Sequence, residues 1–451
     1  MGATGGKLPE GALTGMLSSG TMAPVLSFYG KCREAYRRHG KLTGAAAYIS
    51  MAAVYARFFF NSTMFDTLIK DMRVVDILSF SAFGVLGISA GLAAVFGPDR
   101  RQSVLQLLVL MSAAASYAFT HNTDMMMLLT AAVAMRDRDP RPFLISSLVI
   151  GWGMMLSAYW ASMNGYIPYL VYETKGSSLK MAAHAFGIIF STDFSAHILF
   201  MVMAYCAIRG FRMGAAEYML QWLLVWFCWR YTGALTAVAC MMLFLVLYAG
   251  LRALAYLRKG GGRVPAWTAA LHPACAIASL IAVRLYDGVV PTGALYTTVE
   301  GKNQSFLGRL YMSRRAFEEY PLKLFGQEVA ERGGGRVPDT SQAYFFLDIS
   351  YVRILVIYGL ALFIIYLTLM ALASYRCARC GEGVFAIALA VTALDAIVEH
   401  HAIDISYNVF IILAFCRIGG NGPSGNKISF RRLIGTGRCR GEKNGCDDRA
   451  A

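Results

Sequence analysis

Charged residues are scarce in this chain, and their scarcity excludes an ordinary soluble domain. Of the 451 residues, 15% are charged, whereas soluble domains carry about 25%. Hydrophobic residues make up 57% of the chain, and the mean hydropathy is +0.50. Long apolar runs fill most of the sequence. Composition therefore predicts an all-α, polytopic membrane protein built as a bundle of transmembrane helices.

Several motifs of soluble enzymes are also missing. The sequence has no Walker loop, no glycine-rich dinucleotide turn and no GxSxG motif, which argues against ATP hydrolysis and dinucleotide chemistry. No internal repeat is visible, and no stretch interleaves basic with aromatic residues as nucleic-acid-binding segments do. The formal net charge of +15 therefore does not indicate nucleic-acid binding, because much of it is explained by membrane topology.

The ten cysteines avoid the loops that we place outside the membrane. This distribution excludes an exported framework of disulfides. Cys377 and Cys380 form a single CxxC at the end of an apolar segment, without a matching second pair. We interpret them as reduced thiols, with a zinc site as the less favoured alternative.

Twelve apolar segments predict transmembrane spans, and the distribution of Lys and Arg predicts their orientation. Cytoplasmic segments of membrane proteins carry an excess of these residues. With the N-terminus inside, the inner segments hold 27 Lys and Arg and the outer segments 12. The predicted spans lie near residues 43–61, 75–97, 103–120, 123–135, 143–163, 193–208, 216–229, 233–250, 266–284, 351–373, 384–398 and 404–418.

This topology divides the chain into five parts and places both termini in the cytoplasm. The parts differ in hydropathy and charge. They are a basic cytoplasmic N-terminal extension (1–42), transmembrane helices 1–9 (43–284), a large extracellular loop (285–350), transmembrane helices 10–12 (351–418) and a disordered basic cytoplasmic tail (419–451).

The large loop is unusual because it carries seven of the twelve outer basic residues. Apolar positions between 306 and 320 predict short helices lying on the membrane surface. Arg309, Arg314 and Arg315 fall within seven residues, a grouping that suits a diphosphate because guanidinium groups bind phosphate oxygens in pairs. Anchoring to anionic lipid is the alternative. The loop thus indicates that something anionic is bound outside the cell.

Three further groups of ionisable residues flank predicted spans on the same side. Asp193 begins a span and His197 follows one helical turn later, which suits a proton relay or a sugar hydroxyl, or else only a capped helix. Arg230 at a span end needs an anionic partner, unless it reaches lipid head groups. The run Glu399-His400-His401 suits general base chemistry; a structural turn is its alternative, and a metal site is less favoured.

Three segments give the chain a resemblance to a known family. They are STDFSAH at 191–197, GRLYMSRRAFEEYPLKLFGQ at 308–327 and EHHAIDISYNVFIILAF at 399–415. Together with the span pattern, they resemble the Wzy-type polysaccharide polymerases of O-antigen, capsule and exopolysaccharide synthesis. Family members usually have an arginine before the first of these segments. Here Lys180 and His184 stand near that place.

The resemblance implies a glycosyltransferase of the bacterial plasma membrane. Such an enzyme joins polyprenyl-diphosphate-linked repeat units on the outer face and releases polyprenyl diphosphate. It implies no cofactor and no metal, and its expected partners are lipid-linked glycans, a chain-length regulator and a flippase. Alternatives are a ligase resembling the O-antigen ligases, or a flippase or transporter of the same lipid-linked glycan.

The resemblance also implies roles for particular residues. The expected catalytic residues are Glu399, His400, His401, Asp193 and Arg309, with the identity of the base left open. The expected diphosphate ligands are Arg230, Arg314, Arg315 and Lys180, and the other expected site residues are His197, Gln327 and Asn408. This assignment predicts that Arg309 faces the Glu399–His401 turn across an outward-opening cavity.

Overall fold

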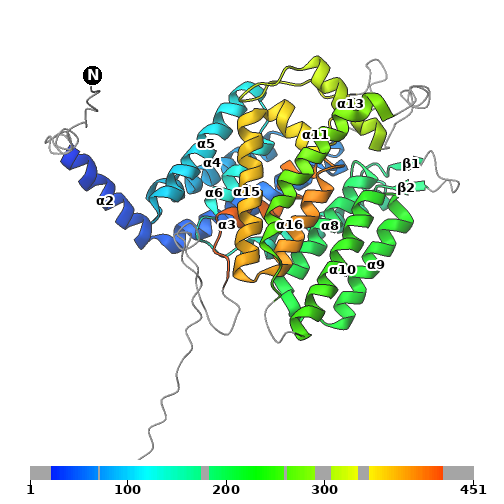
Figure 1. The fold of residues 1–451 in the computed structure, drawn as a ribbon, viewed down its shortest axis with the longest axis horizontal. Helices are drawn as coiled ribbons and strands as arrows, with labels where there is room; N and C mark the ends of the chain where they lie inside the picture. The colour runs from blue at the N-terminus through cyan, green and yellow to red at the C-terminus, as the bar shows by residue number, and fades with distance from the viewer. Residues whose placement is uncertain are drawn as a thin grey trace, which may run out of the picture.

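The computed structural model describes residues 22–69, 72–173, 182–257, 262–289, 306–333 and 345–419. It is a helical bundle with one short antiparallel hairpin, in which β1 (Val171–Glu173) pairs with β2 (Ala182–His184) (Figure 1). Within these residues, eight helices are long and apolar enough to cross a membrane. The protein is therefore a multi-pass membrane protein, as composition predicts.

The eight long spans match eight of the predicted segments. Helix α11 continues from a 3₁₀ turn that begins at Ala266, and α15 continues from α14 through a π-helical turn. The spans are α3 (Gly40–Asn61), α4 (Arg73–Phe96), α5 (Arg100–Thr120), α7 (Arg141–Met163), α8 (Ser191–Arg209), α10 (Leu235–Leu257), α11 (Leu271–Val289) and α14 (Ser350–Arg353) with α15 (Gly359–Cys380).

Three other predicted spans form shorter or more polar helices. Helix α9 (Ala215–Thr232) packs beside α10. Helices α6 (Asp124–Ala134) and α16 (Gly383–Asp395) contain 11 and 13 residues. At a rise of 1.5 Å per residue they reach roughly 17 and 20 Å, short of a hydrocarbon core of about 30 Å. Most residues of α6 and α16 are buried, so both helices lie inside the bundle.

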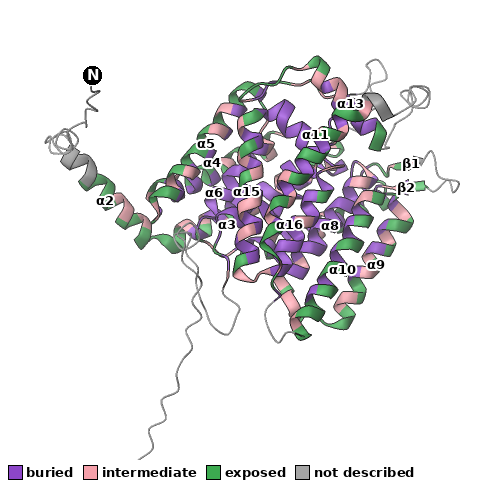
Figure 2. Cartoon of the chain, viewed as in Figure 1, coloured by how far each residue is buried: buried purple, intermediate pink, exposed green. Residues whose placement is uncertain are grey.

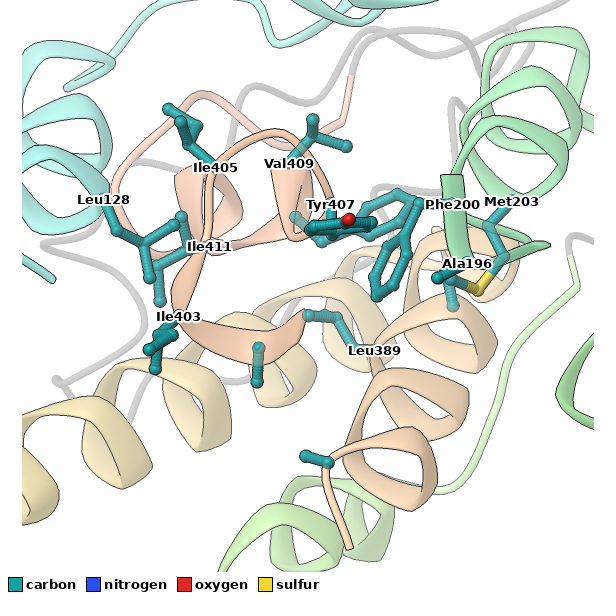
Figure 3. Close-up of a cluster of buried hydrophobic side chains, with 14 of the residues drawn as sticks. Leu128, Ala196, Phe200, Met203, Leu389, Ile403, Ile405, Tyr407, Val409 and Ile411 are labelled. Carbon is teal, nitrogen blue, oxygen red and sulfur yellow. The ribbon is translucent and has the colours of Figure 1, made fainter. Parts of the chain in front are cut away.

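The prediction of a spanning helix over 404–418 is wrong. This segment forms two short 3₁₀ turns, His401–Ile403 and Val409–Ala414, joined by irregular backbone. Its apolar side chains pack against α6, α8 and α16 (Figure 3). Irregular backbone is tolerated at membrane depth only where protein encloses it. Here the Arg376 guanidinium donates to the carbonyl oxygens of Leu413, Ala414 and Cys416 at 2.5–2.8 Å. These carbonyl groups, which no regular helix pairs, thereby gain hydrogen-bond donors.

Helix α8 lies at the centre of the bundle. In its most apolar window 72% of the residues are buried, against 28% for the peripheral helix α5. Figure 2 shows the same contrast, with buried residues gathered on α8 and α16 and exposed ones on the outer helices. Accordingly, Ser191, Asp193 and Phe194 at the start of α8 are buried, and Thr192 is half-buried.

The large loop contains α13 (Phe306–Glu319), one of the predicted surface helices, which packs against α11. Beyond it, residues 321–327 dock on the π-helical turn before α15. The amide of Gln327 donates to the Ile357 carbonyl at 2.9 Å, and the amide of Leu360 donates to the Lys323 carbonyl at 3.0 Å. Gly326 and Gly359 permit this close approach, because both have a positive φ and neither leaves space for a Cβ: one at Gly326 would meet the Ile357 carbonyl oxygen, and one at Gly359 would meet the Gly326 nitrogen.

The N-terminal extension contains a helix that the sequence did not predict, α2 (Met22–Arg38). It projects away from the rest of the bundle at the left of Figure 1. The Tyr29 hydroxyl donates to the Val95 carbonyl at 2.9 Å, and its ring contacts Phe96. The predicted disordered tail beyond Gly419 lies outside the described residues.

Candidate functional site

Ionisable side chains from four separate segments meet at one end of the bundle. Asp193 comes from the first turn of α8, Arg309 from α13, and Asp348 from the irregular segment before α14. The other members come from the end of α16 and the turn that follows it. We name this group the acid–histidine cluster: Asp193, Arg309, Asp348, Asp395, Glu399, His400 and His401.

Arg309 is held by two carboxylates of the acid–histidine cluster. Its two terminal nitrogens lie 2.9 and 3.0 Å from the two carboxylate oxygens of Glu399, a bidentate pair. Its Nε lies 3.5 Å from Asp348 Oδ2. Arg309 is 9% exposed and Glu399 5% exposed. Because water screens little at this burial, the pair is a strong electrostatic feature.

His401 lies between two carboxylates. Its Nε2 is 3.6 Å from Asp193 Oδ1, and its Nδ1 is 3.4 Å from Asp395 Oδ2. Both distances exceed the usual 2.7–3.2 Å of an N–H···O hydrogen bond. The neighbouring ring of His400 places Nδ1 4.0 Å from Asp348 Oδ1. The two histidines therefore face carboxylates of three different segments.

Aromatic rings connect His197 to the acid–histidine cluster. The His197 ring stacks between Phe59 and Tyr407, with centroid distances of 3.9 and 4.0 Å. Tyr407 in turn lies 4.4 Å from the His401 ring. The Nε2 atom of His197 pairs with the Ser62 hydroxyl at 2.8 Å. His197 thus borders the cluster through Tyr407 and fixes the rings behind it.

Burial and charge act together on two groups in the turn after α16. Burial raises the pKa of the Glu399 carboxyl to about 7, although the Arg309 guanidinium opposes the shift. Burial would lower the pKa of His401, but the carboxylates of Asp193 and Asp395 outweigh it and raise that pKa to about 10. The charge of each group therefore depends on its neighbours within the cluster.

A second ion pair positions Asp348. Arg353 pairs with Glu331 and donates to the Leu347 carbonyl at 3.2 Å, while Glu331 accepts the Leu347 amide at 3.0 Å. The Arg353 guanidinium also lies over the ring of Phe346, 4.8 Å from its centroid. These contacts fix the segment on both sides of Asp348, so its carboxylate is held towards Arg309.

Ser350 joins the two segments that carry most of the cluster. Its hydroxyl donates to the Glu399 carbonyl at 2.5 Å and accepts the Ala402 amide at 3.3 Å. The Asn408 amide donates to the Ala402 carbonyl at 2.7 Å on the other side of the turn. Asn408 therefore stabilises the turn that carries Glu399, His400 and His401.

The structure brings together Asp193, Arg309, Glu399, His400 and His401 from the predicted set. The predicted contact between Arg309 and the Glu399–His401 turn is present, but the side chains are buried instead of lining an open cavity. His400 and Asp348, whose side chains are 24% and 19% exposed, form the more accessible side of the cluster.

The other predicted ligands of a diphosphate make different contacts. Arg314 and Arg315 pair with Glu318 and Glu319, one turn later on the exposed side of α13. Arg230 is exposed and lies over the Tyr231 ring. Lys180 falls outside the described residues. Gln327 donates to the Pro321 carbonyl at 2.7 Å, which supports the docked loop and not the cluster.

Sequence reasoning missed Asp348 and Asp395. Asp395 lies within a predicted span, one helical turn before Glu399, and an acidic residue at membrane depth is a functional candidate by default. That signal was available from spacing alone. Asp348 has no such signal, because a single acid before a span resembles an ordinary polar flank.

Two overlapping trios have ligand atoms close enough for one metal ion. They are Asp193 with His400 and His401, and Asp348 with Glu399 and His400. In each trio the ligand atoms lie within 4.8 Å of one another. The arrangement can therefore do three kinds of chemistry: bind an anion at Arg309, exchange a proton, or hold a cation.

Comparison with known proteins adds no assignment. No family model matches the chain, and no curated protein and no solved structure matches it.

Proposed function

We propose that the protein is a membrane glycosyltransferase of the Wzy type, which polymerises polyprenyl-diphosphate-linked oligosaccharide repeat units on the outer face of the bacterial plasma membrane. The observation that carries the proposal is the buried pair of Arg309 and Glu399. A guanidinium held at one end of a transmembrane bundle suits the diphosphate of a lipid-linked donor. The neighbouring carboxylates and imidazoles suit the proton transfer that glycosyl transfer requires.

The contacts suggest an exchange at Arg309. Donor diphosphate would replace Glu399 on the guanidinium, because both groups offer paired oxygens to the same nitrogens. Glu399 would then be free to accept a proton. The acceptor hydroxyl oxygen attacks the anomeric carbon, and its proton passes to Glu399. The bond from the anomeric carbon to the diphosphate oxygen breaks, and polyprenyl diphosphate leaves with the electron pair.

This mechanism needs no general acid for the leaving group. Diphosphate is a weak base, so it departs without prior protonation once its charge is balanced. The protein has to orient two long amphiphilic substrates and stabilise the developing negative charge. Arg309 would stabilise the negative charge, and the ends of α8, α13 and α16 around it would orient the substrates.

Deletion of the gene tests the proposed function. We expect the deletion strain to accumulate single lipid-linked repeat units on the outer face and to lack long polymer. Lipid extracts and polysaccharide gels measure both outcomes. Normal chain length would rule out the polymerase. Units trapped on the inner face would indicate a flippase, and full-length polymer that stays on its lipid carrier would indicate a ligase.

Thiol labelling tests the orientation on which the proposal depends. Glu328 directly follows the docked segment beyond α13, and Arg212 ends the 3₁₀ turn after α8, at the opposite end of that helix from Asp193; both residues are exposed. In intact cells we expect an impermeant thiol reagent to label Glu328→Cys strongly and Arg212→Cys only after permeabilisation. The parent chain, with its native cysteines, supplies the background signal. The reverse pattern would place the acid–histidine cluster in the cytoplasm and exclude polymerisation outside.

A further inference from the structure

The acid–histidine cluster contains more negative than positive partners. Asp193, Asp348, Asp395 and Glu399 contribute four carboxylates, and Arg309 contributes the one guanidinium in the cluster as we define it. Arg353 lies nearby, but its charge is offset by Glu331. Buried charges without partners are costly. The cluster therefore requires added positive charge, as protons or as a cation.

The buried ring of His401 marks the position at which a cation would find unpaired ligand atoms. Its side chain is 1% exposed, and neither ring nitrogen has a hydrogen-bond partner among the described residues. The same holds for both carboxylate oxygens of Asp395, which is also 1% exposed. The separations of 3.4 and 3.6 Å are too long for hydrogen bonds. Two ligands of one tetrahedral cation, each about 2.0–2.2 Å from it, lie roughly 3.3–3.6 Å apart.

We propose that Asp193, His400 and His401 bind one divalent cation of the Zn²⁺ or Mn²⁺ class. Two imidazoles and one carboxylate form a ligand set that these ions favour. Asp193 Oδ1 and His401 Nε2 are already at a suitable separation. The third ligand lies within 4.8 Å of both, so His400 has to approach by at most roughly 1.5 Å. Its side chain is 24% exposed, and its Nδ1 has no hydrogen-bond partner among the described residues that would have to be given up.

Asp395 orients the His401 ring for this cation site. Its carboxylate faces Nδ1 of His401, which leaves Nε2 directed towards Asp193. Metal-binding histidines usually direct their second nitrogen to a carboxylate in this way. The competing trio of Asp348, Glu399 and His400 is less suitable, because Arg309 already binds both of its carboxylates. Asp395 is thus a positioning residue for the cation site.

The cation would also offset a repulsion that the proposed mechanism has to overcome. This part of the inference rests on the proposed function. A diphosphate that approaches Arg309 meets the surrounding carboxylates, which repel it. A divalent ion beside Arg309 would reverse that repulsion, and its open coordination positions would accept phosphate oxygens. The ion would therefore strengthen donor binding, while Glu399 remains the proton acceptor.

Metal analysis of the purified full-length protein tests the site without an activity assay. Protein in lipid nanodiscs is stripped with chelator, incubated with Zn²⁺ or Mn²⁺ separately, and passed through a desalting column. We expect about one ion per wild-type chain by mass spectrometry, and Mn²⁺ bound to protein by electron paramagnetic resonance. Asp193→Asn should retain less than about a tenth of that amount. Asp395→Asn should bind roughly 10- to 100-fold more weakly.

His121→Asn is the control, because His121 is exposed and ends α5 at the same side of the bundle; it should retain the ion. Thermal unfolding identifies any variant that fails to fold, and a folded Asp193→Asn protein that keeps the ion would overturn the site. Wild-type protein that retains no ion would overturn it as well. If the ion binds as described but stripped protein still extends polymer at the normal rate, the role at the diphosphate is wrong and the site stands.

Discussion

Arg309→Ala is expected to abolish polymer formation. Loss of a charged donor that stabilises developing negative charge lowers rates by about 100- to 1,000-fold, and here the donor also binds the substrate. The measurement is polysaccharide chain length in a deletion strain complemented with the variant. Arg309→Lys should recover little, because an ammonium group cannot form the two parallel contacts that Arg309 makes with Glu399.

Stability has to be separated from activity in this experiment. Removing Arg309 leaves Glu399 and Asp348 buried without their partner, and breaking a buried ion pair costs about 3–5 kcal/mol. The double variant Arg309→Gln with Glu399→Gln removes both charges of the bidentate pair, so that only Asp348, the more exposed of the two carboxylates, loses its contact with Arg309. We expect its unfolding temperature to approach that of the wild type while polymer stays absent.

The matched control is an ion pair at the other end of α8. Arg209 lies 2.9 Å from Glu217, and both side chains are partly exposed. Arg209→Ala should leave chain length unchanged. Normal polymer from folded Arg309→Ala protein would contradict the proposed role, and Arg309 would then be a structural link between α13 and the turn after α16.

The contact between Arg309 and Glu399 was predictable from sequence, whereas its electrostatic surroundings were not. The positive-inside rule counts only Lys and Arg, and seven of these residues lie in the large loop. The same loop holds eight acidic residues. The structure pairs four of them, Glu318, Glu319, Glu331 and Asp348, with arginines. The loop is therefore not a free basic surface, and an anion has to compete for Arg309.

The wrong prediction of a spanning helix over 404–418 has a related cause. Hydropathy reports how strongly a segment avoids water, and it cannot tell lipid from the protein interior. The segment after Asp404 is apolar enough to resemble a span, but it is short, and runs of this length are often re-entrant or buried. Nothing in its own sequence shows that Arg376, on another helix, satisfies its carbonyl groups. Long-range hydrogen bonds of this kind decide the structure.

Gly326→Ala is expected to disrupt the site without changing any residue in it. Gly326 has φ +85°, and a Cβ there would lie 2.0 Å from the Ile357 carbonyl oxygen. Backbone cannot move aside as a flexible side chain does. We expect the 321–327 segment to undock from the π-helical turn, which would move α13 and with it Arg309. The result should be a loss of at least about 3 kcal/mol in unfolding free energy, together with loss of polymer.

Gly165→Ala isolates the effect of backbone strain from that of the close contact. Gly165 has a similar φ of +76°, but nothing lies within 4 Å of the place that a Cβ would occupy there. The left-handed conformation alone costs a non-glycine residue about 1–2 kcal/mol. Thermal unfolding should therefore show a small shift for Gly165→Ala and a large one for Gly326→Ala. Equal shifts would mean that the docked loop yields easily, and Arg309 would then not depend on the contact between Gly326 and the turn before α15 for its position.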